Sequence, residues 1–164
     1  SLIDHFTLFY YRFLENCPDD EHFWSNQINT SAINNWYGLA FERVCLMHIP
    51  QIKQKLGITG VLTNVHSLYC KADADKGLFG SQIDLILVRK DQIINLCEMK
   101  YSGAEFIMTM KEDRNMARRI HDLQIIVGSG YAIHPILITT YGLADNKYSG
   151  IIQTVVTMDD LFAP

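Results

Sequence analysis

The sequence has no excess of positive charge, no closely spaced cysteine pair and no long hydrophobic run. Its 164 residues carry a formal net charge of −4, so any contact with nucleic acid requires a local basic patch. The four cysteines are scattered without a CxxC pair, which is typical of reduced thiols in a cytoplasmic protein. No apolar stretch is long enough to cross a bilayer and no signal peptide is present, so we expect no membrane attachment.

The sequence also lacks a P-loop and does not begin with methionine. Because no GxxxxGK[ST] motif is present, we expect no ATP binding through a P-loop in this chain. The first residue is Ser1 and apolar residues follow at once, which suggests a fragment of a longer protein, although removal of a tag would also explain this start. We expect a helical segment over residues 1–30, at the junction to a missing part, and a main domain over residues 31–164.

Apolar periodicity predicts helices that alternate with strands. We expect helices over residues 2–14, 22–28, 32–56 and 109–127, and strands over residues 61–69, 83–88, 93–97, 134–140 and 151–157. Gly57 should end the third helix, and Pro50 should kink it or divide it in two. Helices interleaved with apolar strands predict a three-layer α/β domain, with a central mixed sheet flanked by helices.

Three charged residues interrupt the two most apolar strands. The strands are rich in β-branched residues and should be buried, so Asp84, Glu98 and Lys100 are costly there unless they are paired or bind a metal. Side chains two apart on a strand share a face, which places Glu98 and Lys100 together and Met99 opposite. Two converging carboxylates beside an ammonium group indicate a site for a hard divalent cation that acts on a phosphate.

These residues also form a known pattern. Glu42 on a helix, Asp84 on a strand and Glu98-Met99-Lys100 on the next strand resemble the PD-(D/E)XK nuclease superfamily, which has a restriction-endonuclease-like core. The wider sequence resembles the C-terminal nuclease-like domain of bacterial and archaeal AAA+-like ATPases. The segments that carry this resemblance are Trp36-Tyr-Gly-Leu-Ala-Phe-Glu42-Arg-Val-Cys, Gln82-Ile-Asp84-Leu, Asn95-Leu-Cys-Glu98-Met-Lys100-Tyr-Ser102 and Thr139-Thr-Tyr-Gly142-Leu.

The resemblance implies a metal-dependent nuclease that acts on DNA, with RNA as an open alternative. Asp84 and Glu98 would hold Mg²⁺, or Mn²⁺ in its place, and Glu42 would complete the metal shell directly or through water. Lys100 would orient the attacking water or stabilise the transition state. The implied partner is an N-terminal P-loop ATPase domain of the same protein.

Two predictions leave alternatives open. Gln82 and a basic face of the 109–127 helix are candidates for nucleic-acid contact, but such a face is as often ordinary solvated surface. The basic residues are Lys111, Arg114, Arg118 and Arg119. Likewise, Glu98, Lys100 and Asp84 could form an ion network in a catalytically inactive PD-(D/E)XK-fold module that binds a protein or a nucleic acid.

Overall fold

The computed structural model describes residues 4–28 and 30–163 and divides the chain into two compact units. The first unit is Ser1–Arg43 and the second is Val44–Pro164. The division falls inside helix α3 (Ser31–Met47), whereas the sequence predicts a boundary at residue 30. Each unit is therefore described by itself.

The first unit is helical and is held together by an aromatic cluster. It contains α1 (His5–Phe9), the π-helix η1 (Tyr10–Leu14), α2 (Phe23–Gln27) and the first part of α3. The rings of Phe9 and Phe13 lie 5.9 Å and 5.6 Å from the ring of Trp36 on α3. The helix predicted over residues 2–14 is thus confirmed where the chain is described, and residues 2 and 3 lie outside the described part.

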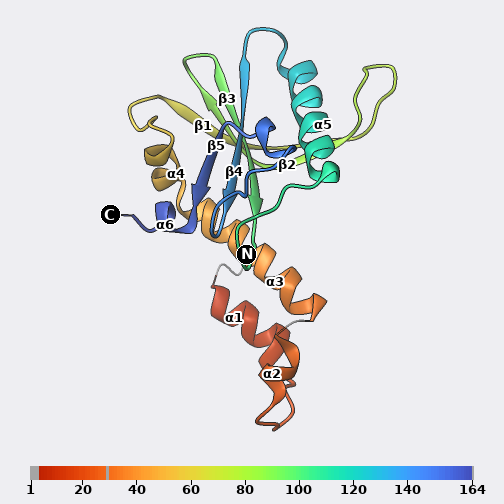
Figure 1. The fold of residues 1–164 in the computed structure, drawn as a ribbon, viewed down its shortest axis with the longest axis vertical. Helices are drawn as coiled ribbons and strands as arrows, with labels where there is room; N and C mark the ends of the chain where they lie inside the picture. The colour runs from red at the N-terminus through yellow and green to blue at the C-terminus, as the bar shows by residue number, and fades with distance from the viewer. Residues whose placement is uncertain (1–3, 29, 164) are drawn as a thin grey trace. The chain divides into compact units, whose positions relative to one another are not determined.

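The second unit is built on a five-stranded mixed sheet whose strands follow the order of the sequence (Figure 1). The first two pairs of neighbouring strands are antiparallel, and the last two pairs are parallel. A parallel neighbour requires a crossover connection, which α5 (Met110–Val127) supplies between the third and fourth strands. The strands are β1 (Thr63–Cys70), β2 (Ser81–Arg89), β3 (Ile93–Lys100), β4 (Ala132–Thr139) and β5 (Thr154–Thr157).

Helices cover both faces of this sheet, so the predicted three-layer α/β architecture is confirmed (Figure 1). On one face, Met116 and Leu123 of α5 are buried in one cluster with Ile86 and Leu96 of the sheet. On the other face lie α4 (Ile49–Lys55) and α6 (Met158–Leu161). An ion pair of 2.9 Å between Lys55 Nζ and Asp160 Oδ1 joins these two helices. Among the described residues, no helix is long and apolar enough to span a membrane.

The helix predicted over residues 32–56 is divided in two, as the proline within it suggests. A turn at His48 separates α3 from α4, and Pro50 lies in the first turn of α4, where its missing N–H costs nothing. Gly57, with a φ of +67°, ends α4. Its N–H donates to the carbonyl of Gln54, and the next N–H donates to the carbonyl of Lys53, which is the Schellman arrangement of a helix C-terminus.

Helix α5 begins at a capping box. The hydroxyl of Thr109 accepts a hydrogen bond from the N–H of Glu112, and the Glu112 carboxylate accepts one from the N–H of Thr109 at 2.7 Å. Gly128, with a φ of +74°, follows the last residue of the helix. Residues at its two ends therefore define where α5 begins and where it stops.

All four cysteines are free, and two of them lie in the interior of the second unit. Burial raises the pKa of the Cys97 thiol, and the neighbouring thiol of Cys45 raises it further. These two residues therefore behave as apolar core side chains.

Candidate functional site

The predicted carboxylates lie on the neighbouring antiparallel strands β2 and β3. Leu85 lies opposite Cys97 and Ile86 lies opposite Leu96, and the recorded pairing ends there. Beyond Leu85 the regular register is lost, because His66 of β1 pairs with Ile86 and Leu68 pairs with Ile83, which leaves a bulge at residues 84 and 85 of β2. Ile83 packs in the cluster with Met116 of α5, whereas the side chain of Asp84 is exposed. The convergence of Asp84 with Glu98 therefore stays a prediction.

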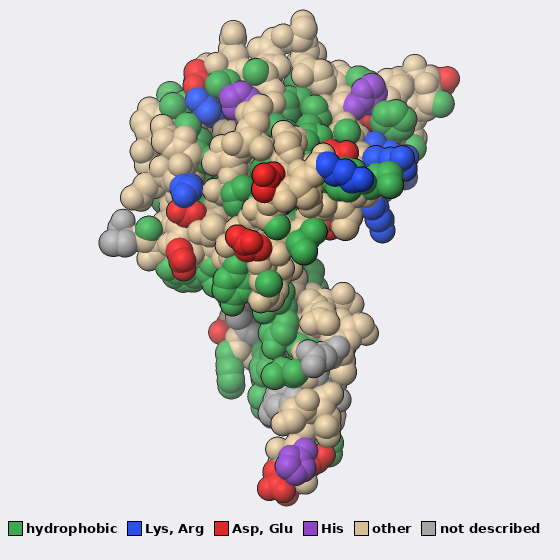
Figure 2. All heavy atoms as spheres, in the orientation of Figure 1, with side chains coloured by type: hydrophobic (Ala, Val, Ile, Leu, Met, Phe, Trp, Pro, Cys, Tyr) green, Lys and Arg blue, Asp and Glu red, His purple; other side chains and the backbone are tan. Residues whose placement is uncertain are grey.

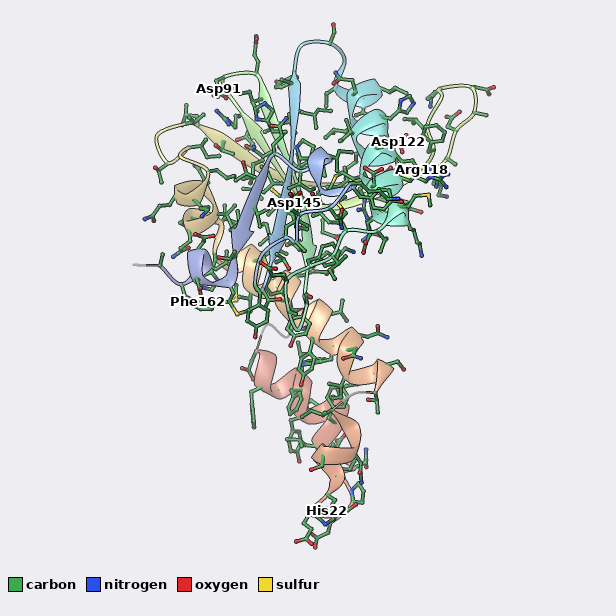
Figure 3. The ribbon with its side chains drawn as sticks, in the orientation of Figure 1. His22, Asp91, Arg118, Asp122, Asp145 and Phe162 are labelled. Carbon is green, nitrogen blue, oxygen red and sulfur yellow. The ribbon has the colours of Figure 1, made fainter. Side chains whose placement is uncertain are left out.

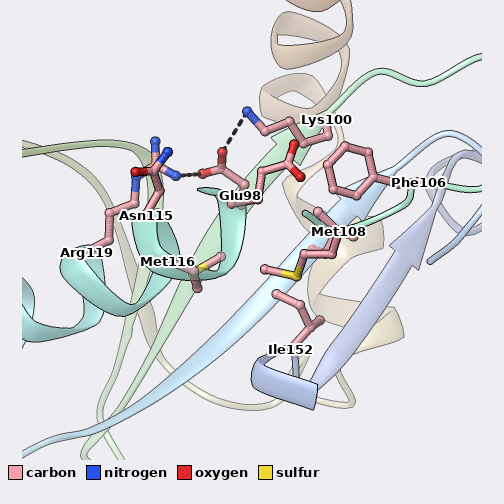
Figure 4. Close-up of a pocket in the computed structure, with 10 residues that line it drawn as sticks. Glu98, Lys100, Phe106, Met108, Asn115, Met116, Arg119 and Ile152 are labelled. Carbon is pink, nitrogen blue, oxygen red and sulfur yellow. Dashed lines mark hydrogen bonds and ion pairs between the residues drawn. The ribbon is translucent and has the colours of Figure 1, made fainter. Parts of the chain in front are cut away.

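Glu98 is held between two cations (Figure 4). Its Oε1 atom lies 2.9 Å from Nζ of Lys100, and its Oε2 atom lies 2.6 Å from Nη1 of Arg119. The side chain of Glu98 is 14% exposed, so the two ion pairs explain how a carboxylate is tolerated on this strand. Met99 is buried on the other face of β3, which confirms the predicted alternation.

Arg119 takes a position that the sequence analysis did not foresee. Besides its bond to Glu98, its Nε atom donates to the backbone carbonyl of Gln82 at 3.0 Å. The guanidinium group therefore links α5 to both β2 and β3. Arg118 and Arg119 are neighbours in the sequence, but successive residues of a helix point about 100° apart. This rotation is the signal that could have separated Arg119 from the basic face.

Asp84 contacts a residue of its own strand. Its side chain is exposed, and its Oδ1 atom accepts a hydrogen bond of 2.9 Å from the amide of Gln82, two residues earlier on the same strand face. The ion network predicted for Asp84, Glu98 and Lys100 thus has a different composition, because Arg119 takes the third place.

Glu42 belongs to the first unit, whereas Asp84, Glu98 and Lys100 belong to the second. Glu42 is partly buried near the middle of α3. Its predicted part in the site stays a prediction.

A small pocket of about 50 Å³ opens beside Glu98 and Lys100 and has room for a few water molecules. Phe106 and Met108, from the segment that follows β3, form part of its wall. The hydroxyl of Thr140 accepts from the N–H of Ser102 at 2.9 Å, and the carbonyl of Gly142 accepts from the N–H of Phe106 at 2.8 Å. The segment Thr139-Thr-Tyr-Gly142 therefore holds this wall in place, a role that the sequence did not reveal.

The predicted basic face exists on α5. Lys111, Arg114 and Arg118 line one open hollow of about 550 Å³. A second hollow, of about 200 Å³, is lined by Gln82, Arg118 and Arg119 together with the residues that begin β2. Lys and Arg side chains gather where α5 meets the loop that precedes β2 (Figure 2). Gln82 and the four basic residues thus lie next to the Glu98 pocket, while their contact with nucleic acid stays a prediction.

The residues of the site fit the implied metal ion in chemistry but not in number. Within residues 4–28 and 30–163, no group of three His, Cys, Asp or Glu side chains is arranged to hold a metal. Asp84 and Glu98 nevertheless offer hard oxygen donors on two neighbouring strands, which fits Mg²⁺ or Mn²⁺ in chemistry. Glu98 would have to exchange one of its two ion pairs for the metal.

Comparisons with known proteins add little to this picture. No family model matches the chain, and a search of curated proteins finds no match. Among solved structures, the chain is similar to the crystal structure of a protein of unknown function, AF1548, with a TM-score of 0.46 and 16% identity. The alignment covers 69% of this chain and 56% of that one, so the chain spans little more than half of that structure. A similarity at this level carries no argument about activity.

Proposed function

We propose that the chain is a nuclease-like domain that binds and hydrolyses phosphodiester bonds of DNA with the help of Mg²⁺ or Mn²⁺. The observation that carries the proposal is the Glu98–Lys100 pair on one face of β3, with Asp84 on the facing strand. Carboxylates are hard ligands for Mg²⁺, and a metal with a neighbouring ammonium group can stabilise the charge that develops on a phosphate.

Each residue of the set has a role that follows from its contacts. Lys100 is partly exposed and already bonded to Glu98, so its ammonium group is positioned to orient a water or to stabilise charge that develops on a phosphate. Arg119 and Gln82 hold the carboxylates of Glu98 and Asp84 in place. Asp84 and Glu98 would hold the divalent cation, which would supply charge neutralisation at the phosphate and make a neighbouring water more acidic.

The cellular context of the proposal comes from the sequence. The resemblance to the C-terminal domain of AAA+-like ATPases supports an N-terminal P-loop ATPase domain as partner and a cytoplasmic location. The four free cysteines agree with a reducing compartment. DNA is the proposed target because of the resemblance. RNA is the alternative, and the same assays with an RNA substrate compare the two.

Nicking of supercoiled plasmid DNA tests the proposal. With Mg²⁺ or Mn²⁺ the wild-type chain should nick the plasmid, and Lys100→Ala should lower the rate by about a hundredfold or more, as is typical when a transition-state group is removed. Lys90→Ala is the matched control, because Lys90 is an exposed lysine in the turn between β2 and β3. If wild type and Lys100→Ala are equally inert with both metals, the enzyme hypothesis fails.

The alternative is a catalytically inactive module of the same fold. The observation that favours it is the closed ion network, in which Glu98 is already neutralised by Lys100 and Arg119. The first unit also exposes aromatic side chains, with Phe6 68% and Tyr11 60% exposed, which suits a protein contact. Calorimetry with Mg²⁺ and Mn²⁺ separates the two functions, since this module needs no metal.

A further inference from the structure

Phe79 is an exposed aromatic residue with two side chains of α5 against its ring. It is 55% exposed, although it lies directly before Gly80 and the start of β2. The guanidinium carbon of Arg118 lies 5.6 Å from the centre of the Phe79 ring, and the ring of His121 lies 4.9 Å from it. An aromatic ring that is open to solvent beside a cation is the arrangement on which proteins stack unpaired bases.

The backbone beneath this ring is firmly anchored. The N–H of Phe79 donates to Oδ1 of Asp122 at 2.9 Å, and the hydroxyl of Ser81 donates to the same carboxylate at 2.5 Å. Asp122 is fully buried. Gly80 has a φ of +87°, and a Cβ atom there would come within 2.8 Å of the backbone nitrogen of Ala72. The loop therefore presents Phe79 in one arrangement, which reduces the entropy that a stacking partner has to overcome.

A continuous basic path joins Phe79 to the Glu98 pocket. The two hollows on α5 share Asn115 and Arg118, and the smaller one shares Asn115 and Arg119 with the Glu98 pocket. Among the described residues, no Asp or Glu lines either hollow, although the chain carries a net charge of −4. Lys111 and Arg118 lie about 10 Å apart along the helix axis, so the basic side chains extend over about two turns of α5.

From these observations we propose that Phe79 and Arg118 form a stacking site for one unpaired base, so that the substrate is a nucleic acid with a single-stranded segment. The inference rests on the proposed function and adds the shape of its substrate. In a duplex, each base is already stacked between its neighbours and cannot cover the Phe79 ring. An unpaired base can, and the strand that follows it runs over Lys111, Arg114 and Arg118 toward Lys100.

Binding without metal tests this site separately from cleavage. In a buffer with chelator, a labelled oligothymidine strand and a blunt duplex of the same length are titrated with protein and followed by fluorescence anisotropy. Phe79→Ala should weaken binding of the single strand by about tenfold or more, which is the usual value of one base–aromatic stack, and should change duplex binding much less. Phe79→Trp should keep the affinity, and its indole fluorescence should be quenched when the strand binds.

The matched control is Phe162→Ala. Phe162 is 62% exposed and packs on His48 with ring centres 4.7 Å apart, so it resembles Phe79 in exposure and in its histidine neighbour. Figure 3 shows that Phe162 lies on the side of the sheet opposite Arg118. The single strand should bind this variant with wild-type affinity.

The outcomes distinguish this inference from the proposed function. If Phe79→Ala binds the single strand as tightly as wild type does, the stacking site is wrong while the proposed function stands. The same conclusion follows if both variants of Phe79 lose affinity for the single strand and for the duplex to the same extent. Unquenched fluorescence in bound Phe79→Trp also overturns the stacking site. If wild type binds neither nucleic acid, both the proposed function and the stacking site fail.

Discussion

The buried carboxylate of Asp122 should stabilise the loop that carries Phe79, and replacing it provides a quantitative test of this arrangement. Asp122 lies on α5 (Figure 3) and accepts hydrogen bonds from the N–H of Phe79, the hydroxyl of Ser81 and, at 3.7 Å, the thiol of Cys70. Asp122→Asn keeps the size of the side chain but removes its charge and one acceptor oxygen.

The expected loss follows from these contacts. The asparagine oxygen can still accept from the N–H of Phe79, whereas its NH₂ group faces the Ser81 hydroxyl, which has to turn in order to accept. One charge-assisted hydrogen bond is thus replaced by a weaker neutral one, and a second is weakened. Because hydrogen bonds to charged groups are worth about 1.5–3 kcal/mol, we expect a loss of about 2 kcal/mol in the free energy of unfolding. For a chain of this size, that loss lowers the Tm by about 4–8 °C.

The dependence on pH has a definite sign. Burial raises the pKa of Asp122, but the hydrogen bonds from Ser81, Phe79 and Cys70 together outweigh burial and hold the pKa below its usual value of 3.8. A carboxyl group whose pKa is lower in the folded state stabilises the fold above its unfolded pKa, and this contribution is lost as the pH falls through the folded pKa. The difference between wild type and Asp122→Asn should therefore be constant above about pH 5 and should shrink below about pH 4.

Urea unfolding at neutral pH and at about pH 3, followed by circular dichroism, measures both effects. Asp75→Asn is the matched control, because Asp75 is an exposed carboxylate in the same loop. If Asp122→Asn is as stable at neutral pH as Asp75→Asn, Asp122 does not anchor the loop. A difference that grows below pH 4 would contradict the assigned direction of the pKa shift.

Two further predictions concern the basic face and the edge of the site. Reversing Arg114 and Arg118 to Glu should weaken nucleic-acid binding and reduce the slope of log affinity against log salt by about 1 to 2, since each lost phosphate contact contributes about 0.9. An unchanged slope, measured by anisotropy at several salt concentrations, would show that this face is ordinary solvated surface. Asp84→Asn should abolish nicking but change the free energy of unfolding by less than about 0.5 kcal/mol, because Asp84 is exposed. A loss of more than about 2 kcal/mol in urea unfolding would make Asp84 a structural residue instead.

The sequence by itself determined the features that depend on local periodicity and on the residues that begin or end helices. Alternation along β3 placed Glu98 and Lys100 on one face and Met99 on the other, because strand side chains repeat every two residues. Pro50 predicted the break before α4, and Gly57 predicted the end of α4. Each prediction depends only on the conformations that the residue's own backbone allows. The alternation of helices and apolar strands was enough to predict the three-layer α/β architecture.

Short elements at the end of the chain were missed although a local signal was present. Helix α6 was not predicted, yet Thr157 and Asp160 form a capping box at its start. Four residues are too few for a periodic apolar pattern, so a cap without such a pattern was not recognised.

Only the tertiary structure decided the partners of these residues. The third member of the ion network is Arg119 rather than Asp84, because the phase of α5 and its packing on the sheet select which arginine reaches β3. The anchoring of Phe79 joins β2 to Asp122, which lies 43 residues further along the chain, and no periodicity within either element encodes that contact. Contacts of this kind depend on how separate elements pack, and a single sequence without packing cannot rank the possible partners.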